Sequence, residues 1–554
     1  MVQLSRREKQ LILGSFSLLW IYIILRAFTV FLVHDEIVSK WAYMIDWNFL
    51  PFQGYLDANN HFLNSFLGGL FIRLFSSDAI FISRLGNVLA FPLLAYSLYG
   101  FKDYFHSKSN FIFFLAAICS TQFILDFFSL ARGYGLAWSF LLLAILNTLK
   151  FLDKQKSKNL ALLLLAWLLC IYSNLSYLPL ALIGIAYAFG FAAFNRQYQH
   201  FAWFFLVLAP LLFLIEYSFD LQSSGKLYLG SSENFFQTVV HPLTEYQSFG
   251  FFASLDVLLS LLSLGITFHL LRKLRNRWTP FQLDLLLPTL FILSLLSLFA
   301  QNWLFGINYP ENRSAVHLYI LFFGAIAFSF QNQLLSKVFY GFAAIFLLFF
   351  CLNFNLGYTQ VYTYEHFDPD LLKSIPENTE GTPSCVGGRF WTIDNELARV
   401  HDLPLRTNQD CPFPSDTVVD YMITLEEARP EILDTYRALK TDPISKLTLY
   451  ERKRFLKRTK AEENELPFQG TQEYIDLIPP IKNRPCFIRC SGKIEDVNIF
   501  EDYGIIFSAD DSTSSLPALY QGVSFVSNAK INAKGEVNFA FTFAVKPLPH
   551  SDFV

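Results

Sequence analysis

Long apolar runs constrain this chain more than any other feature. The stretches at 11–33, 283–300 and 338–354 are nearly free of charged side chains, and they approach or reach the length that crosses a bilayer. Only 16% of the 554 residues are charged, against about a quarter in soluble domains. Since almost all of this deficit lies before residue 355, we expect a polytopic α-helical membrane domain at 1–355. The formal charge of -3 gives no basic field for nucleic acid.

Charged loops predict how the chain is threaded. The connections Lys150–Lys158 and Arg272–Arg277 are strongly basic, so the positive-inside rule places them in the cytoplasm together with the N-terminus. The first run is too long for a signal peptide and has no small-x-small cleavage site, so we expect it to stay as a span. The threading is consistent if the short apolar segment 62–75 lies at the interface without crossing. About eleven crossings then leave the C-terminus outside the cytoplasm, and we expect the protein in the cytoplasmic (inner) membrane. The expected spans are 11–33, 79–101, 111–128, 135–149, 160–172, 178–194, 201–217, 251–271, 283–300, 315–330 and 338–354.

From about residue 356 the composition becomes that of a soluble domain, which we expect to be α+β and extracytoplasmic. Segments 431–439 and 448–464 have the pattern of helices. From about residue 486 short alternating runs at 504–508, 522–526 and 537–545 predict a small antiparallel β-unit. Four cysteines permit two disulfides if this domain is outside the cytosol, with the pairing left open: Cys385, Cys411, Cys486 and Cys490.

Two polar groups stand in the expected outer loop at 34–78. Asp35 and Glu36 follow the first span, and their simplest interpretation is solvation of a helix end or capping of a next helix at 38–47. Asn59, Asn60 and His61 precede the short apolar segment, where asparagine is likewise a preferred cap.

Two further groups lie at expected outer turns. The first contains Asp126, Arg132 and Tyr134, and an ion pair between Asp126 and Arg132 is its simplest interpretation. The second contains Tyr309 and Arg313, where the arginine could simply anchor to lipid headgroups. Together the four groups place two arginines, several carboxylates, a histidine and tyrosines on one membrane face. This set suits a reaction on an anionic, lipid-linked substrate.

The order of these groups resembles a known family. An acid pair after the first span, an Asn/His patch before a short interfacial helix, and Ser83-Arg84-Leu85-Gly86 in the next span resemble bacterial GT-C membrane glycosyltransferases. The groups most similar are the protein-mannosyltransferase and aminoarabinose-transferase-like enzymes of the glycosyltransferase family 39 type. Segments 128–134 and 309–313 resemble further elements of that pattern, and the resemblance covers roughly residues 10–330. Asn59-Asn60-His61-Phe62 departs from the family's more usual His/Lys-Pro-Pro-Leu, which leaves the sugar and the acceptor open.

The resemblance implies transfer of a sugar, with inversion, from a polyprenyl-phosphate donor to an extracytoplasmic lipid, glycan or protein. A carboxylate must deprotonate the acceptor hydroxyl, which implies Asp35 as the base and Glu36 as its orienting partner. Cationic and polar groups must bind the donor and its departing phosphate. The residues this implies for substrate binding are Asn59, Asn60, His61, Arg132, Tyr134, Tyr309 and Arg313.

Two questions stay open at this point. Whether a divalent metal takes part is the first: the candidate ligands are Asp35, Asp126 and His61, which could bind one only if the fold brings them together. A lipid or polysaccharide transporter or flippase is the main alternative function, because intramembrane charges and broken helices mark those proteins too. A glycan polymerase or ligase of another fold is the second alternative.

Overall fold

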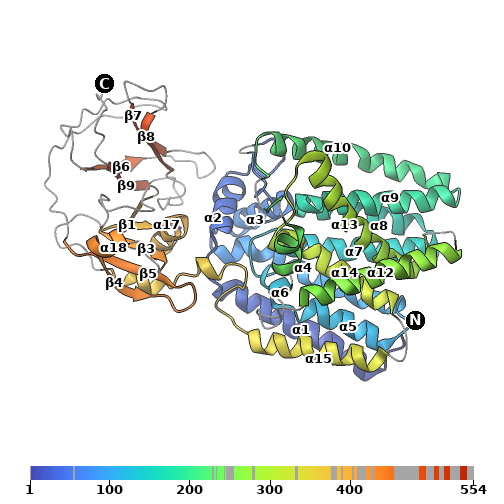
Figure 1. Cartoon of the computed structure of the whole chain (residues 1–554). Helices are drawn as coiled ribbons and strands as arrows, with labels where there is room; N and C mark the ends of the chain where they lie inside the picture. Colours follow the sequence, from blue (N-terminus) through green and yellow to red (C-terminus); the bar gives the residue numbers. More distant parts are fainter. Residues whose placement is uncertain are drawn as a thin grey trace. The chain divides into compact units, whose positions relative to one another are not determined.

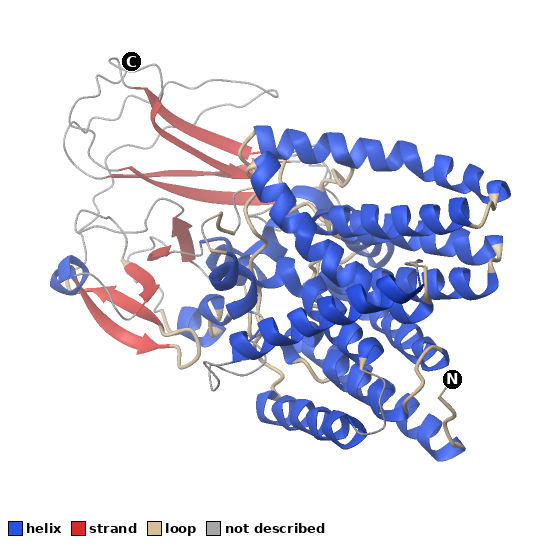
Figure 2. Cartoon of the chain, turned by 45° about the vertical axis from the view of Figure 1, so that its right-hand side comes forward, coloured by secondary structure: helices blue, strands red, loops and turns tan. Residues whose placement is uncertain are grey.

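In the computed structural model of this chain, every apolar run expected to cross a membrane contains a helix. Clustering of contacts divides the chain into two units, the first formed by Met1–Val30 and Ala42–Val361 and the second by Phe31–Trp41 and Tyr362–Val554. Helices gather in the first unit and the named strands in the second (Figure 2). The structure describes residues 2–53, 56–227, 230–232, 234–242, 244, 255–277, 281–330, 335–375, 384–388, 391–401, 405–408, 420–425, 430–454, 486–494, 504–510, 517–524 and 537–545.

Eight helical segments within the described residues are long and apolar enough to cross a membrane. They correspond to α1 (Arg6–Thr29), α4 (Ile80–Gly100), α7 (Tyr134–Lys154), α9 (Leu178–Phe194), α10 (Phe201–Ser223), α12 (Leu255–Arg277), α13 (Leu286–Phe305) and α15 (Ser336–Asn353). The chain is therefore a multi-pass membrane protein. Three other expected spans form shorter helices: α5 (Lys108–Cys119), α8 (Ser157–Ser173) and α14 (Val316–Ser329).

The interior of the first unit is built around α7, which packs against α4 and α8 (Figure 1). In α7, 83% of the apolar stretch is buried, whereas the corresponding share in α12 is 11%. Helix α7 is apolar and buried on nearly all sides, which is typical of a helix in the core. The apolar side chains of α12 are mostly exposed in the protein alone, which suits contact with lipid. Short helical turns join the helices of this unit: η2 (Phe101–Asp103), α6 (Gln122–Asp126), η3 (Leu175–Tyr177), η4 (Tyr198–His200), η5 (Phe236–Val240), η6 (Leu283–Leu285) and η7 (Asn312–Ala315).

The short apolar segment forms α3 (Phe62–Phe75), with the bounds expected from the sequence. Arg73 is the charged residue that interrupts the apolar sequence of α3 near its end, and its guanidinium binds backbone carbonyl groups of a neighbouring turn. It donates hydrogen bonds of 2.9 Å to the carbonyl oxygens of Met44 and Ile45 in the π-helical turn η1 (Lys40–Ile45), and it lies 4.2 Å from the ring centre of Trp47. This contact satisfies carbonyl groups that a helix end leaves without intrahelical partners.

The second unit contains a mixed five-stranded sheet in the order β2-β1-β3-β5-β4. Strand β1 (Ser384–Gly388) runs parallel to β2 (Leu405–Asn408) and β3 (Tyr421–Leu425), and β5 (Leu447–Arg452) is antiparallel to β3 and β4 (Tyr436–Thr441). The helical elements of this unit are α2 (His34–Ser39), η9 (Thr363–Glu365), α16 (Pro369–Lys373), α17 (Trp391–Val400) and α18 (Pro430–Thr435).

Antiparallel strands are confirmed in the expected β-rich part where it is described, but they form two separate two-stranded sheets: β6 (Cys486–Ile494) pairs with β9 (Val537–Val545), and β7 (Gly504–Asp510) with β8 (Pro517–Ser524). Two helix predictions are wrong in part. The helix expected at 431–439 ends at Thr435, and the charged helix expected at 448–464 begins as strand β5, with 455–464 outside the described residues. Both segments have side chains suited to a helix, but cross-strand pairing in the sheet determines their structure. The disulfide prediction also lies outside the side chains that the structure describes.

Candidate functional site

The predicted Asn/His patch meets the predicted Arg/Tyr turn at the start of α3. Nη1 of Arg132 donates a hydrogen bond to Oδ1 of Asn59, and the ring of His61 lies edge-on to that of Tyr134, with 5.3 Å between centroids. Asn60, His61, Arg132 and Tyr134 are each at most 4% exposed. The fold thus brings together residues 73 positions apart in sequence, Asn59 and Arg132, that were grouped as substrate-binding. We call Asn59, His61, Arg132 and Tyr134 the Asn59–Tyr134 cluster.

Helix capping does not explain the asparagines. The residue that precedes α3 is His61, and its side chain makes no capping hydrogen bond. Oδ1 of Asn60 accepts a 3.0 Å hydrogen bond from the hydroxyl of Ser65, and that of Asn59 accepts from Arg132. Both amides are therefore used for contacts between side chains, so the simple capping interpretation is wrong.

Gly133 makes this approach possible. A Cβ atom at this position would lie 1.9 Å from the carbonyl oxygen of Ser173 and 2.8 Å from Cβ of His61. Both distances are below any contact that real Cβ atoms make, so only glycine allows the turn before α7 to press against His61 and the end of α8.

Asn64 and Asn87, which the sequence analysis did not select, hold the backbone near Arg132 in place. Nδ2 of Asn87 donates to Oδ1 of Asn64 at 2.7 Å, and Nδ2 of Asn64 donates to the carbonyl oxygen of Ala131 at 3.0 Å. Oδ1 of Asn87 accepts from the backbone N–H of Leu136 at 3.1 Å. These bonds hold the residues on either side of Arg132. The sequence could have indicated this role, because Asn64 and Asn87 each lie within an apolar helix, α3 and α4. A buried amide in such a helix needs a hydrogen-bond partner.

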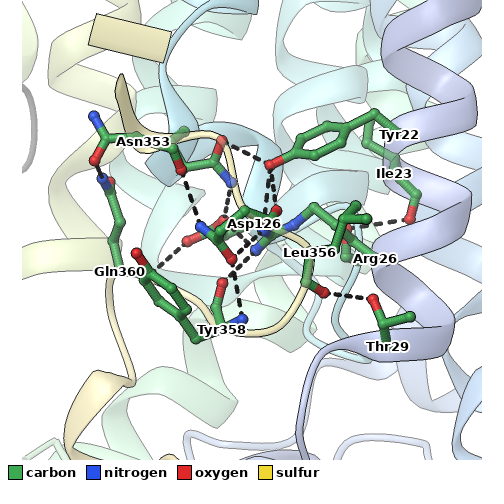
Figure 3. A network of polar contacts seen from close by, with 12 residues as sticks. Tyr22, Ile23, Arg26, Thr29, Asp126, Asn353, Leu356, Tyr358 and Gln360 are labelled. Carbon is green, nitrogen blue, oxygen red and sulfur yellow. Dashed lines mark hydrogen bonds and ion pairs between the residues drawn. The ribbon is translucent and has the colours of Figure 1, made fainter. Parts of the chain in front are cut away.

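Asp126 lies in a separate buried network and pairs with an arginine other than the expected one. Its Oδ1 lies 2.6 Å from Nη2 of Arg26, and both side chains are fully buried. Gln122 Nε2 donates to the same oxygen at 2.7 Å, while Oδ2 accepts from the backbone N–H of Gln360 at 2.7 Å. Arg26 also donates to the carbonyl oxygens of Asn355, at 2.6 Å, and Tyr358, at 2.8 Å (Figure 3). The network fastens the segment after α15 to α1 and α6, which is a structural role.

Arg84, an element of the family-like pattern, also has a structural task. It is fully buried in α4, and Nη1 donates to the carbonyl oxygens of Ala27, at 3.0 Å, and Val30, at 2.9 Å. These carbonyls belong to the C-terminal end of α1, where the helix dipole and orphan carbonyl groups favour a cation.

The acid pair, Asp35 and Glu36, is the group whose structural setting differs most from the one predicted from the sequence. Asp35 and Glu36 lie in the first turn of α2, which begins at His34 instead of near residue 38, and Glu36 is fully buried. The expected outer loop therefore begins with a helical turn, and this turn belongs to the second unit. Oδ2 of Asp35 accepts a hydrogen bond of 3.3 Å from the hydroxyl of Tyr362, and Oε2 of Glu365 accepts one of 2.8 Å from the backbone N–H of His34. Acidic side chains at a helix start are favoured by the helix dipole.

Tyr309 lies in an irregular segment between α13 and η7, where the following proline, at 310, disfavours helix. Tyr309 is buried in an apolar cluster with Val239, Leu298, Ala315 and Leu318, and its backbone N–H donates to the carbonyl oxygen of Ser231 at 3.0 Å. Arg313 lies in the 3₁₀ turn η7. Among the described residues, no group of three or more His, Cys, Asp or Glu side chains could hold a metal ion.

No protein-family model matches the chain, and no curated protein sequence matches it. The contacts of these residues are therefore the basis for assigning a function.

Proposed function

We propose that this chain is a membrane glycosyltransferase that moves a sugar from a polyprenyl-phosphate donor to an acceptor on the extracytoplasmic face. The observation that carries the proposal is the Asn59–Tyr134 cluster, in which a buried guanidinium, an amide, an imidazole and a phenol meet at the ends of membrane helices. These groups supply the hydrogen-bond donors that a phosphate needs. A buried arginine binds phosphate more strongly than an exposed one, and its planar fork can hold two oxygens.

The chemistry asks two things of the protein. Negative charge grows on the donor phosphate as the glycosidic bond breaks, and donors fixed in advance stabilise it at little reorganisation cost. Arg132 is our candidate for this role, with His61 and Asn59 beside it, and Arg313 is the second candidate. The acceptor hydroxyl must lose its proton to a base, for which Asp35 remains the candidate. A single displacement inverts the anomeric carbon and needs no covalent intermediate.

The donor-binding part of the proposal can be tested without knowing the sugar or the acceptor. Polyprenyl phosphate itself serves as the probe, added to the purified protein in lipid nanodiscs, and its binding is read from the shift in thermal unfolding. Arg132→Lys keeps the positive charge but loses the planar fork, so we expect binding to weaken by about ten-fold or more. Arg73→Lys makes the same change at an arginine outside the Asn59–Tyr134 cluster, one that donates to the carbonyl oxygens of Met44 and Ile45, and this variant should bind as the wild type does.

Transfer itself is then measured with radiolabelled polyprenyl-phosphate hexoses and pentoses and with membranes as the source of acceptor. Label should move from the lipid-phosphate fraction to a stable product, and Arg132→Lys should slow this step. Equal binding by wild type and Arg132→Lys, with a loss in Arg313→Lys, would move the phosphate site to Arg313. Movement of intact donor across the bilayer without release of sugar would support a flippase and refute the proposal.

A further inference from the structure

The segment that carries the acid pair is part of the C-terminal unit. Phe31–Trp41 clusters with Tyr362–Val554, although more than 300 residues separate the two in sequence. Helix α2 packs on α17, and Tyr362, just before η9, donates a hydrogen bond to Asp35 itself. These contacts indicate what the C-terminal unit does.

The first set of contacts anchors α2 to α17. Nζ of Lys40 lies 2.8 Å from Oε1 of Glu396, and Arg399 Nη2 and Nε lie 2.8 and 2.9 Å from the two oxygens of the same carboxylate. Lys40 and Glu396 are 1% and 2% exposed. The cations of Lys40 and Arg399 also lie 4.9 and 5.0 Å from the ring centre of Trp41. A buried carboxylate shared by two cations needs all its partners, because loss of one leaves an uncompensated buried charge.

The second set fixes the segment that touches Asp35. Asp442, fully buried in the turn between β4 and β5, lies 2.9 Å from Nδ1 of His366 and accepts from the backbone N–H of Asp368 at 3.2 Å. The ring of His366 lies 4.8 Å from that of Phe31, just before α2. Tyr362, at the start of this segment, is fully buried and donates its hydroxyl to Asp35.

We infer that the C-terminal unit positions the carboxylate of Asp35, with Tyr362 as the positioning residue and the Lys40–Glu396–Arg399 group as the anchor of its helix. The inference rests on the proposed function, since Asp35 needs precise placement only if it receives a proton from an acceptor. At 3.3 Å the hydrogen bond is longer than the optimum for a hydroxyl donor. Bonds to catalytic groups are often long before substrate binds and shorten in the complex.

A double-mutant cycle tests the positioning role. Tyr362→Phe removes only the hydroxyl, so the ring keeps its packing. In the radiolabel assay we expect kcat to fall about ten-fold with an unchanged KM for the donor, because a hydrogen bond to a charged group contributes on this scale. In an Asp35→Asn background the same change should cost nothing further, because the two residues act as a unit. Tyr364→Phe, at a neighbouring residue that is 44% exposed, is the matched control and should retain full kcat.

The anchor has a readout independent of activity. Glu396→Gln should accelerate amide hydrogen exchange across 34–39, whereas Tyr362→Phe should leave it as in the wild type. Unchanged exchange in Glu396→Gln would overturn the anchor. Wild-type kcat in Tyr362→Phe, or an equal loss with and without Asp35→Asn, would overturn the positioning role while the transferase proposal stands. A wild-type protein that transfers no sugar from any donor would overturn both.

Discussion

Gly133→Ala gives the sharpest test of the Asn59–Tyr134 cluster. The added Cβ would lie 1.9 Å from the carbonyl oxygen of Ser173, whereas real Cβ atoms essentially never approach within 3.0 Å. The difference, 3.0 − 1.9 = 1.1 Å, is the smallest separation that the turn and α8 must gain. Neither side can yield cheaply, because the opposing atom is backbone and the second contact, at 2.8 Å, is Cβ of His61.

A displacement of about 1 Å in substrate-positioning groups can cost about 100-fold in rate. We therefore expect Gly133→Ala to reduce sugar transfer by roughly that factor and to weaken polyprenyl-phosphate binding. The assay compares initial rates at equal amounts of folded protein, quantified by size-exclusion chromatography in detergent.

Gly341→Ala is the matched control for Gly133→Ala. Gly341 lies within α15, and an added Cβ would meet nothing within 4 Å. Alanine is the better helix former by about 1 kcal/mol, so this variant should be as stable as the wild type or more so, with full activity. If Gly133→Ala transferred sugar at the wild-type rate, the contact among the turn, His61 and α8 would not hold the substrate, and the site would have to lie elsewhere.

Three further predictions concern stability and threading. Asp126→Asn keeps the shape of the side chain but leaves the buried charge of Arg26 uncompensated, so unfolding in denaturant should become easier by about 3–5 kcal/mol, and an unchanged midpoint would contradict the role of this pair. Burial alone would raise the pKa of Glu396, but hydrogen bonds from Arg399 and the charge of Lys40 lower it overall from 4.5. A lowered folded-state pKa adds stability above the unfolded value, so the wild type should lose its advantage over Glu396→Gln as the pH falls below 4.5, and a difference that stayed constant with pH would contradict this. Finally, a C-terminal reporter active only outside the cytoplasm should function when fused after residue 554, and a reporter active only in the cytosol would reverse the predicted threading.

Hydropathy predicted the helices well because membrane helices must satisfy their backbone groups within one segment. The bounds of α3 follow from the sequence because they are those of its apolar run. Strands β4 and β5 were missed because their charged side chains suit a helix, and only pairing across the sheet decides between the two structures. The groups at Asn59 and Arg132 were found by residue type, yet their contact depends on Gly133 and Asn64, which act through close packing that no local pattern reveals.

The sequence did not predict that Asp35 belongs to the C-terminal unit. A short segment between two membrane helices is most simply understood as a loop of the membrane domain, but its partners, Tyr362, Glu365 and Glu396, all come from the C-terminal unit. The chain therefore passes between the units at residues 30–31, 41–42 and 361–362. If Asp35 is the base, sugar transfer requires the C-terminal unit as well as the membrane helices, because the residues that hold α2 and the Asp35 carboxylate come from that unit.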